Sequence, residues 1–599
     1  MEQNNFQTTV QTKSKSLTKT IAGIALFTLI ASGITGSYAA LGSYSAATGT
    51  NIFNITARPD HAGGGGGKTA KAALKVYLSN EVISQSVVVG TVDHTFAKLV
   101  LDASALSKDV QINEINFTVQ TNSKTNPSEV SNFRIYDGVV QLATANDPDS
   151  GTSVSVNNGS SATVTFTLTN PLLLPGGASA VLTVKADVST AAAIGGIYRV
   201  GIPHPADPNT VIVDAIIDQG KLTVNYLYSN GTEMNFIRQG TLIFITDADT
   251  PKAGLIPGNT SGLTLAKIRL ASQNEDALVE KIYFTGKAEN GGGWDQVDAF
   301  YISYADVLIP ATVTTTDSNP NGTVLVDMSA DPLLVSKDQP FTISLKADTA
   351  DVGPNTKGAS FQGISVGINS GTDITAKGAS SGNALIVSGS SSFGNPQYLV
   401  RSFPVVATND LLPPGKSIIG GSIATGIESG KSLYAFSVLS SNNDDIGLEH
   451  VKFSIQAENV DLTNLRLVDS ANGTIVATGT PSLGLFPLRQ TIASGASARL
   501  FVLKGDVTCT QANGCASPSS PGSVIVVSLL GDSAFPNPVP GQYPLVFDNF
   551  KWTDFWKTPI LQYADSNVFT ENQWAGGYLL PTTNGGYLAP TSTSVIFSR

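Results

Sequence analysis

The sequence predicts an all-β protein made of three tandem antiparallel β-sandwich domains, followed by an aromatic-rich C-terminal segment. Two observations predict this fold class. Four short segments recur three times along the 599 residues, in the same order and about 165 residues apart. Within each segment apolar and polar residues alternate, which is the pattern of a strand with one buried face. Gly, Asn, Asp, Ser and Pro separate the segments, and helical patterns do not alternate with them, so antiparallel sheets are favoured.

The four recurring segments define where the strands of each domain lie. The second segment is the most regular, with apolar residues at the same place in each copy, as at Ile112, Val279 and Leu448. A period of this length indicates a string of domains, because the units of a solenoid are only about 20–50 residues long. The segments occupy residues 95–103, 264–272 and 433–441; 109–119, 276–286 and 445–455; 130–138, 297–305 and 462–470; and 182–188, 341–348 and 501–507.

The same segments predict the domain boundaries. We expect the sandwiches at residues 70–235, 236–397 and 398–548, and the aromatic-rich segment at 549–599. Residues 40–69 contain an unbroken glycine run at 63–67 and are predicted to be a flexible linker. Several short strands in each unit favour sandwiches of the immunoglobulin-like kind.

The N-terminus has the pattern of a secretory signal peptide. Lys13, Lys15 and Lys19 precede an apolar run at residues 21–31, and small residues follow up to Ala39. The order of basic, apolar and small segments predicts export, with cleavage after residue 39. The alternative is an uncleaved membrane anchor in the same segment, which would be the protein's only membrane contact. Either interpretation predicts a secreted protein or one at the bacterial cell surface.

The two cysteines, Cys509 and Cys515, lie in one polar loop rich in Gly, Pro and Ser. In an exported protein, two cysteines this close are expected to form a disulfide. A redox-active pair is the alternative, but the spacing is C-x5-C rather than C-x-x-C. The sequence therefore predicts a structural crosslink within this loop.

Six repeated acids are the candidate metal ligands. Three belong to Lys-x-Asp pairs at a strand end, where the two side chains share a face and can form a solvated ion pair. The alternative is a calcium site, which needs several oxygen ligands that converge. Calcium is the one cofactor that the sequence suggests, and no EF-hand loop accompanies it. The six acids are Asp109, Asp276, Asp445, Asp187, Asp348 and Asp506.

Composition and motifs argue against catalysis and against nucleic acid binding. Charged residues make up 14% of the chain and the formal net charge is −11, so a phosphate backbone is an unsuitable partner. The four histidines are scattered without metal-ligand spacing. A G-x-S-x-G match at residues 378–382 has polar flanks rather than a strand before it and a helix after it. We therefore expect a protein without enzymatic activity.

The C-terminal segment is rich in aromatic residues, whose large apolar side chains are expected to be buried by contacts. It contains Trp552, Trp556, Trp574 and Tyr578. These side chains could complete the third domain, form a subunit contact or stack on sugar rings. We expect part of the segment to fold over Leu500 and Val502, because only the third copy has an apolar outer face on that strand.

The repeated strands and the Lys-x-Asp strand that closes each copy resemble tandem immunoglobulin-like proteins of the bacterial cell surface, including S-layer-type proteins. The resemblance covers residues 70–545. It implies an exported, non-enzymatic structural component of the cell surface that associates with itself or with other cell-envelope proteins. The alternative is an adhesin or a carbohydrate-binding surface protein that uses loops or tail aromatics to bind glycans.

Overall fold

The computed structural model confirms the all-β fold class. It describes residues 73–599 except 146, 149–153, 157–158, 204–212, 218–219, 305–306, 311–321, 354, 409–420, 442–443, 516–521, 534–548, 556–574 and 591–593. The predicted signal peptide and linker lie outside the described residues. Helical structure in the described part is limited to 3-10 turns, η1 (Pro127–Glu129), η3 (Trp294–Gln296) and η4 (Gly371–Asp373), and no helix there has the length and apolarity to cross a membrane.

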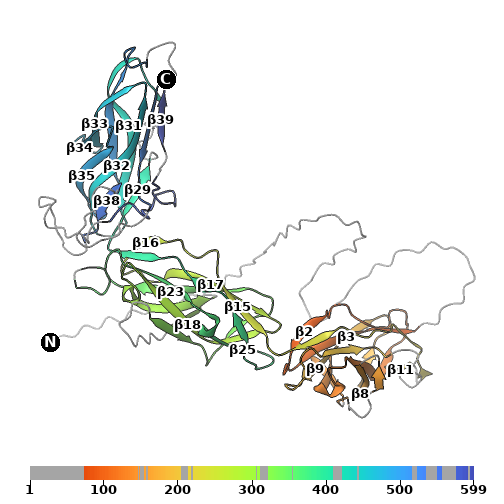
Figure 1. The fold of residues 1–599 in the computed structure, drawn as a ribbon. Coiled ribbons are helices and arrows are strands. Elements are labelled where there is room, and N and C mark those ends of the chain that lie inside the picture. Colours follow the sequence, from red (N-terminus) through yellow and green to blue (C-terminus); the bar gives the residue numbers. More distant parts are fainter. Residues whose placement is uncertain are drawn as a thin grey trace, which may run out of the picture. The chain divides into compact units, whose positions relative to one another are not determined.

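The described strands form six sheets, which lie in three successive pairs (Figure 1). The first pair spans residues 74–237. Its first sheet has the order β13-β1-β3-β9-β5-β6, and its second has the order β12-β11-β4-β10-β14-β2, with β8 beside β4 and β7 beside β8. The strands are β1 (Leu74–Leu78), β2 (Gln85–Val88), β3 (His94–Asp102), β4 (Val110–Thr121), β5 (Val130–Asp137), β6 (Val140–Thr144), β7 (Val154–Val156), β8 (Gly159–Leu174), β9 (Ser179–Val188), β10 (Ile197–Gly201), β11 (Val213–Ile217), β12 (Gly220–Lys221), β13 (Val224–Tyr226) and β14 (Met234–Ile237).

The second pair spans residues 241–400 and repeats this arrangement. Its sheets have the orders β20-β19-β23-β17-β15-β26 and β16-β28-β24-β18-β21, with β22 and β25 beside β18 and β27 beside β24. The strands are β15 (Thr241–Thr246), β16 (Gly254–Pro257), β17 (Leu263–Gln273), β18 (Ala277–Glu289), β19 (Val297–Tyr304), β20 (Val307–Pro310), β21 (Thr323–Asp327), β22 (Leu333–Val335), β23 (Phe341–Thr349), β24 (Gly363–Ile368), β25 (Ile374–Gly378), β26 (Ile386–Ser388), β27 (Ser392–Phe393) and β28 (Gln397–Val400).

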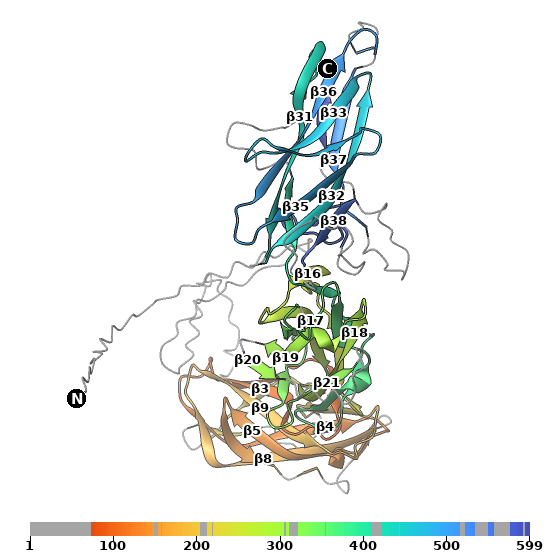
Figure 2. The same cartoon turned by 90° about the vertical axis from the view of Figure 1, so that its left-hand side faces the viewer.

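The third pair spans residues 404–598 (Figure 2). Its sheets have the orders β29-β31-β36-β33-β34 and β30-β39-β37-β32-β35, with β38 beside β32. The strands are β29 (Pro404–Thr408), β30 (Gly421–Ser422), β31 (Gly426–Ser440), β32 (Ile446–Glu458), β33 (Asp461–Asp469), β34 (Ile475–Gly479), β35 (Leu485–Ile492), β36 (Arg499–Cys509), β37 (Val524–Leu529), β38 (Phe550–Thr553) and β39 (Val595–Ser598).

Each sheet pair encloses a hydrophobic cluster built from the alternating residues of its strands. Ile112, Val279 and Leu448, which stand at one repeated position, are fully buried in the three clusters. In each long strand β4, β18 and β32 the pairing register shifts just after this position, so a β-bulge recurs there as well. The repeated sequence therefore specifies both the inward face and a local irregularity of the strand.

The C-terminal segment supplies strands to the third pair. β38 pairs with β32 as β11 pairs with β4 and β25 with β18. β39 pairs in parallel with β30 as β14 does with β2 and β28 with β16. The aromatic side chains of β38 are buried by this pairing, so the first of the three alternatives for the segment holds for Phe550 and Trp552.

The expected contact between this segment and Leu500 and Val502 is wrong for the described residues. Leu500 and Val502 lie on β36, in the sheet opposite β38. Leu500 instead lies beside a cavity that is also lined by Ile492, at the end of β35, and by Ala496 in the connection from β35 to β36. The apolar face of β36 suggested the contact, but the segment contributes its strands β38 and β39 to the opposite sheet, which contains β32.

We predict that ending the chain after residue 548 prevents the third sheet pair from folding. Among the buried side chains that the truncation removes are Phe550, Trp552, Val595 and Phe597, each of which contributes about 1.5–3 kcal/mol by burial. Calorimetry should lose the unfolding enthalpy that the third pair contributes and keep the transition of the first pair. A chain that starts at residue 73 is the control and should keep both. Equal protease resistance of residues 404–548 in the truncated and full chains would contradict the prediction.

Candidate functional site

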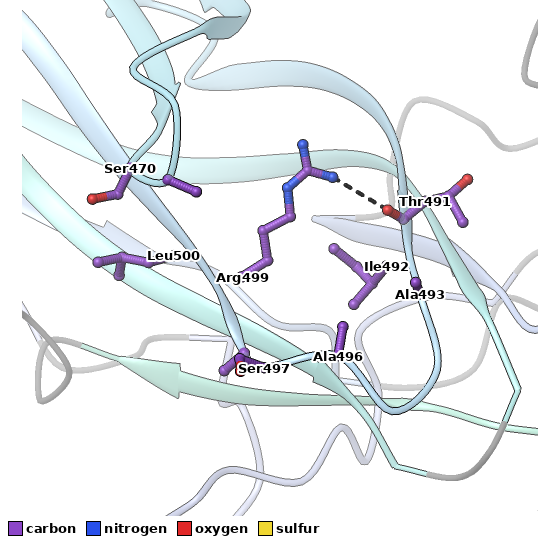
Figure 3. Close-up of a pocket in the computed structure, with 10 residues that line it drawn as sticks. Ser470, Thr491, Ile492, Ala493, Ala496, Ser497, Arg499 and Leu500 are labelled. Atoms are coloured by element: carbon purple, nitrogen blue, oxygen red, sulfur yellow. Dashed lines mark hydrogen bonds between the residues drawn. The ribbon is translucent and has the colours of Figure 1, made fainter.

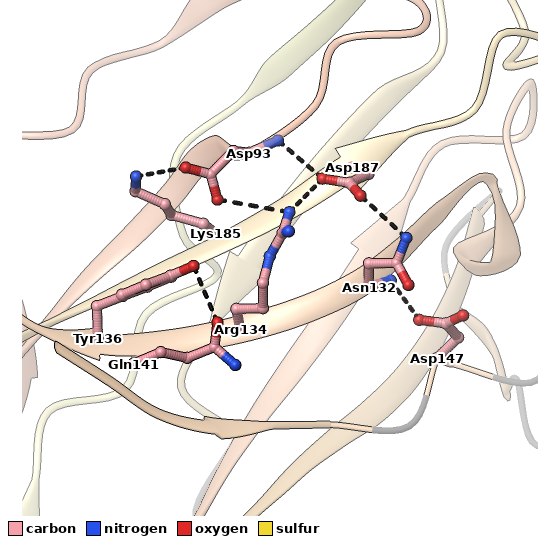
Figure 4. Close-up of polar contacts among 8 residues, drawn as sticks. All are labelled: Asp93, Asn132, Arg134, Tyr136, Gln141, Asp147, Lys185 and Asp187. Atoms are coloured by element: carbon pink, nitrogen blue, oxygen red, sulfur yellow. Dashed lines mark hydrogen bonds and ion pairs between the residues drawn. The ribbon is translucent and has the colours of Figure 1, made fainter. Parts of the chain in front are cut away.

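The Lys-x-Asp aspartates each bind the two strands that flank their own strand. Asp187 lies on β9, between β3 and β5. Its Oδ1 accepts the backbone N–H of Asp93, just before β3, at 2.7 Å. Its Oδ2 accepts the side-chain amide of Asn132 on β5 at 2.9 Å, and the guanidinium of Arg134 pairs with it (Figure 4). One carboxylate therefore joins three neighbouring strands.

Further charges surround this carboxylate in the first pair. Lys185 Nζ lies 2.7 Å from Asp93 Oδ2, and Arg134 lies 3.4 Å from the same carboxylate. Partial burial acts to raise the pKa of Asp187, but the hydrogen bonds from Asp93 and Asn132 and the charge of Arg134 outweigh it and lower that pKa below its ordinary value. The ionised carboxylate is thus the form that the site favours.

The equivalent carboxylates of the other two pairs make the same kind of contacts. Asp506 accepts the backbone N–H of Gly430 at 2.7 Å and the side-chain amide of Asn464 at 2.7 Å, and Arg466 lies 3.5 Å away. Its pKa is lowered by the bond from Asn464 and then by that from Gly430.

The second pair uses neutral donors for the same purpose. Asp348 accepts from Ser261 Oγ at 2.6 Å, from the Gly262 N–H at 2.8 Å and from the Tyr301 hydroxyl at 3.1 Å. The bonds from Ser261 and Gly262 lower its pKa. We call these three sites, centred on Asp187, Asp348 and Asp506, the aspartate locks.

The other three candidate acids also hold backbone groups. Asp109 accepts the N–H of Gly176 at 3.1 Å, Asp276 that of Lys337 at 2.6 Å, and Asp445 that of Ser494 at 2.8 Å. Each donor lies in the loop that leads into β9, β23 or β36. These carboxylates therefore fix the start of the strand whose end carries an aspartate lock.

The six acids do not converge on one another. Within the described ranges no group of three or more His, Cys, Asp or Glu side chains has a metal-binding arrangement. The lone pairs of the six carboxylates are directed at backbone and side-chain donors of their own sheet pair. Calcium binding stays a prediction.

The sequence did not identify the partners of the aspartate locks. Asn132 and Asn464 have φ of 53° and 51°, and Gly262 and Gly430 have φ of 71° and 68°. This left-handed backbone is tolerated by Asn and Gly far better than by other residues. A signal was present, because Asn132 and Asn464 occupy the same place in the third recurring segment. The second copy has Ala299 there, which conceals the pattern.

The predicted disulfide between Cys509 and Cys515 is present. Asn513 shapes the closed loop, because its Oδ1 accepts the Thr510 N–H at 2.9 Å and its amide donates to the Thr508 carbonyl at 2.6 Å. The Arg599 guanidinium donates to the Cys515 carbonyl and lies 3.8 Å from Cys509 Sγ. The crosslinked loop thereby also binds the residue that follows β39.

A cavity of about 460 Å³ opens beside Leu500 on the third pair (Figure 3). Its one charged lining residue is Arg499, which donates to the Thr491 carbonyl at 3.2 Å and is paired with Asp469 at 2.8 Å. The rest of the lining consists of Ala, Ser, Thr, Ile and Leu side chains. The carboxylate of Asp469, which pairs with Arg499, is itself buried, so the charge of this arginine is already balanced.

The tail aromatics are divided between core and undescribed chain. Trp552 is fully buried, and its Nε1 donates to the Gly576 carbonyl at 2.9 Å. Tyr578 is partly buried against the third cluster. Trp556 and Trp574 lie outside the described residues. A buried indole cannot stack on a sugar ring, so glycan binding at Trp552 is not supported.

Comparison with known proteins gives no family. No protein-family model and no curated protein matches the chain. Among solved structures, a putative membrane-anchored protein from Corynebacterium diphtheriae aligns with 10% identity and a TM-score of 0.16, covering 87% of this chain and 90% of that one. The RrgB pilus protein from Streptococcus pneumoniae aligns with 10% identity and a TM-score of 0.15, covering 72% of this chain and 61% of that one. The CupB6 tip adhesin from Pseudomonas aeruginosa aligns with 10% identity and a TM-score of 0.14, covering 48% of this chain and 93% of that one. At these TM-scores the alignments carry no argument.

We predict that Asp187→Ala destabilises the first sheet pair by about 1 kcal/mol, because the exposed donors of Asp93 and Asn132 lose a charged acceptor and bind water in its place. Since the folded-state pKa of Asp187 is lowered, its contribution is present above the ordinary value of 3.8 and is lost as the pH falls below it. Thermal unfolding of both proteins should therefore converge in acid. Asp137→Ala, at an exposed aspartate on β5, is the control and should leave stability unchanged. An equal effect of both substitutions would refute the specific role of the lock.

We predict that intact-mass measurement after alkylation without reductant finds no free thiol. The variant with Ser at both Cys509 and Cys515 should lose about 2 kcal/mol from the third pair, because the bond closes a loop with a sequence separation of only 6. The single variant Cys509→Ser is the control for labelling and should add one alkyl group. Two alkyl groups on the unaltered chain would disprove the crosslink.

Proposed function

We propose that the chain is an exported, non-enzymatic structural component of the cell surface, of the S-layer-like or extracellular-array kind. The observation that carries this proposal is the use of the repeated acids. In every sheet pair the acidic residues that recur in the sequence are engaged in fixing strands and loops of that pair. The recurring acidic residues therefore stabilise the same sandwich three times, which suits a protein that serves as a structural component.

The length of the connections supports the same proposal. Residues 238–240 join the first pair to the second, and residues 401–403 join the second to the third. Connections this short keep successive units adjacent along the chain. The low content of charged residues leaves neutral polar surfaces, on which copies can pack without strong repulsion. The partners we propose are other copies of the chain or other proteins of the cell envelope.

The test is assembly of the chain that begins at residue 40, after the expected cleavage site. Negative-stain imaging and sedimentation should be carried out over a range of concentrations, with calcium and with a chelator. We expect ordered assemblies that grow with concentration, and the two ionic conditions decide whether calcium takes part. A chain that stays monomeric throughout and binds immobilised glycans would overturn the proposal in favour of the adhesin alternative.

A further inference from the structure

The two connections between sheet pairs differ in what surrounds them. The hydrophobic clusters of the first and second pairs have no described member in common. The third cluster, by contrast, includes Leu255 and Val400 of the second pair, and Phe361 and Tyr398 pack against it. Apolar burial is therefore shared between the second and third pairs, and shared burial couples the folding of two units.

Trp552 is one of the residues of the third pair that contact the second. In the pairings of β11, β25 and β38 with their long neighbours, Ala215, Ala376 and Trp552 lie opposite Ile112, Val279 and Leu448, respectively. The first two pairs thus have an alanine where the third has a tryptophan. The indole of Trp552 meets the ring of Phe361 edge to face, with 5.5 Å between centroids and an interplanar angle of 82°.

Phe361 is held in a backbone conformation that a bulky side chain rarely adopts. Its φ is 64°, in the left-handed region, and its N–H donates to the Leu399 carbonyl at 2.7 Å. Such a conformation costs free energy and persists only where the surroundings compensate for it. The contact with Trp552 is the observed compensation on the side of the third pair.

A buried carboxylate completes the contact. Asp554, just after β38, is fully buried. Its Oδ2 accepts the Arg401 N–H at 2.7 Å and the Ser360 hydroxyl. The Arg401 side chain in turn pairs with Asp444 of the third pair at 2.5 Å. Arg401, in the connection between the second and third pairs, is therefore bound by the third pair through both its backbone and its side chain.

In the described part of the chain, polar contacts join the first and second pairs, and the two pairs share no hydrophobic cluster. Lys337 Nζ donates to Gln85 Oε1 at 2.8 Å, Asn383 to the Val89 carbonyl at 2.7 Å, and the Val92 N–H to the Ser380 carbonyl at 3.2 Å. Each such hydrogen bond contributes only about 0.5–1.5 kcal/mol of net stability, because water replaces its partner when the pairs separate.

We infer that Trp552 and Asp554 fasten the second sheet pair to the third, so that residues 241–599 fold and respond to load as one cooperative unit, separate from residues 74–237. We call the contacts of Trp552 with Phe361 and of Asp554 with Ser360 and Arg401 the joint. This inference concerns the single chain and does not rest on the proposed function.

Hydrogen exchange of the full chain tests the joint under native conditions. In Trp552→Ala, which restores the alanine of the other two pairs, amides of residues 359–362 and 398–401 should exchange at least about tenfold faster. Phe361→Ala removes the partner ring from the other side and should give the same result if Trp552→Ala fails to fold. Phe117→Ala, a core change in the first pair, is the matched control and should leave exchange at these residues unchanged, because the first pair unfolds separately.

Calorimetry gives the second readout. The unaltered chain should unfold in two transitions, one for residues 74–237 and one for residues 241–599. Either joint variant should split the second transition in two. Three independent transitions in the unaltered chain, or unchanged exchange at residues 359–362 in both joint variants, would overturn the inference.

Discussion

The fold depends on a carboxylate placed at the end of a central strand, where it reaches both neighbouring strands. In one sheet of each pair, β9, β23 or β36 lies between two partners, and the pairing on both sides includes register shifts. A register shift leaves backbone donors without a ladder partner. The aspartate locks accept backbone donors that no ladder pairs, from Gly430 within a register shift of β31 and from Asp93 and Gly262 just before β3 and β17. The charge of the carboxylate strengthens each bond relative to a neutral acceptor.

The three locks share one backbone donor and differ in their side-chain donors. The backbone N–H donor is retained in all three, from Asp93, Gly262 and Gly430. The side-chain donors vary, because Tyr301 stands where the other copies have Arg134 and Arg466. The constant element is therefore an anionic acceptor facing a tight turn, and the countercharge is optional. This explains why the first and third copies contain ion pairs here and the second does not.

Much of the fold could be predicted from alternation and repetition. The second recurring segment specified the buried faces of β4, β18 and β32, since Ile112, Val279 and Leu448 face the core as expected. The role of the six acids could not be predicted, because it depends on donors supplied by turns elsewhere in the chain. Gly262 and Asp348 are far apart in sequence, and only the pairing of β17 with β23 brings them together.

The strands of the C-terminal segment could not be predicted from repetition either, because their spacing along the chain differs from that of the other copies. The corresponding strands are β11 and β14 in the first pair and β25 and β28 in the second, and in each case they lie close together in the sequence. In the third pair, long connections precede β38 and β39. Their places in the sheet are the same, but their spacing is not, so a search for a fixed period finds no match.

The features found in a single copy lie at the two ends of the third pair. Trp552 and Asp554 stand at the end where β29 pairs with Ser440, near the connection from the second pair. The disulfide stands at the other end of β31 and β36, where Cys509 pairs with Gly426, and it binds Arg599. The locks, in contrast, occur in every copy. Common residues thus build the sandwich, and residues special to one copy determine how its ends are fixed. Differences between the copies are therefore the most informative positions in the chain for locating contacts beyond a single sandwich.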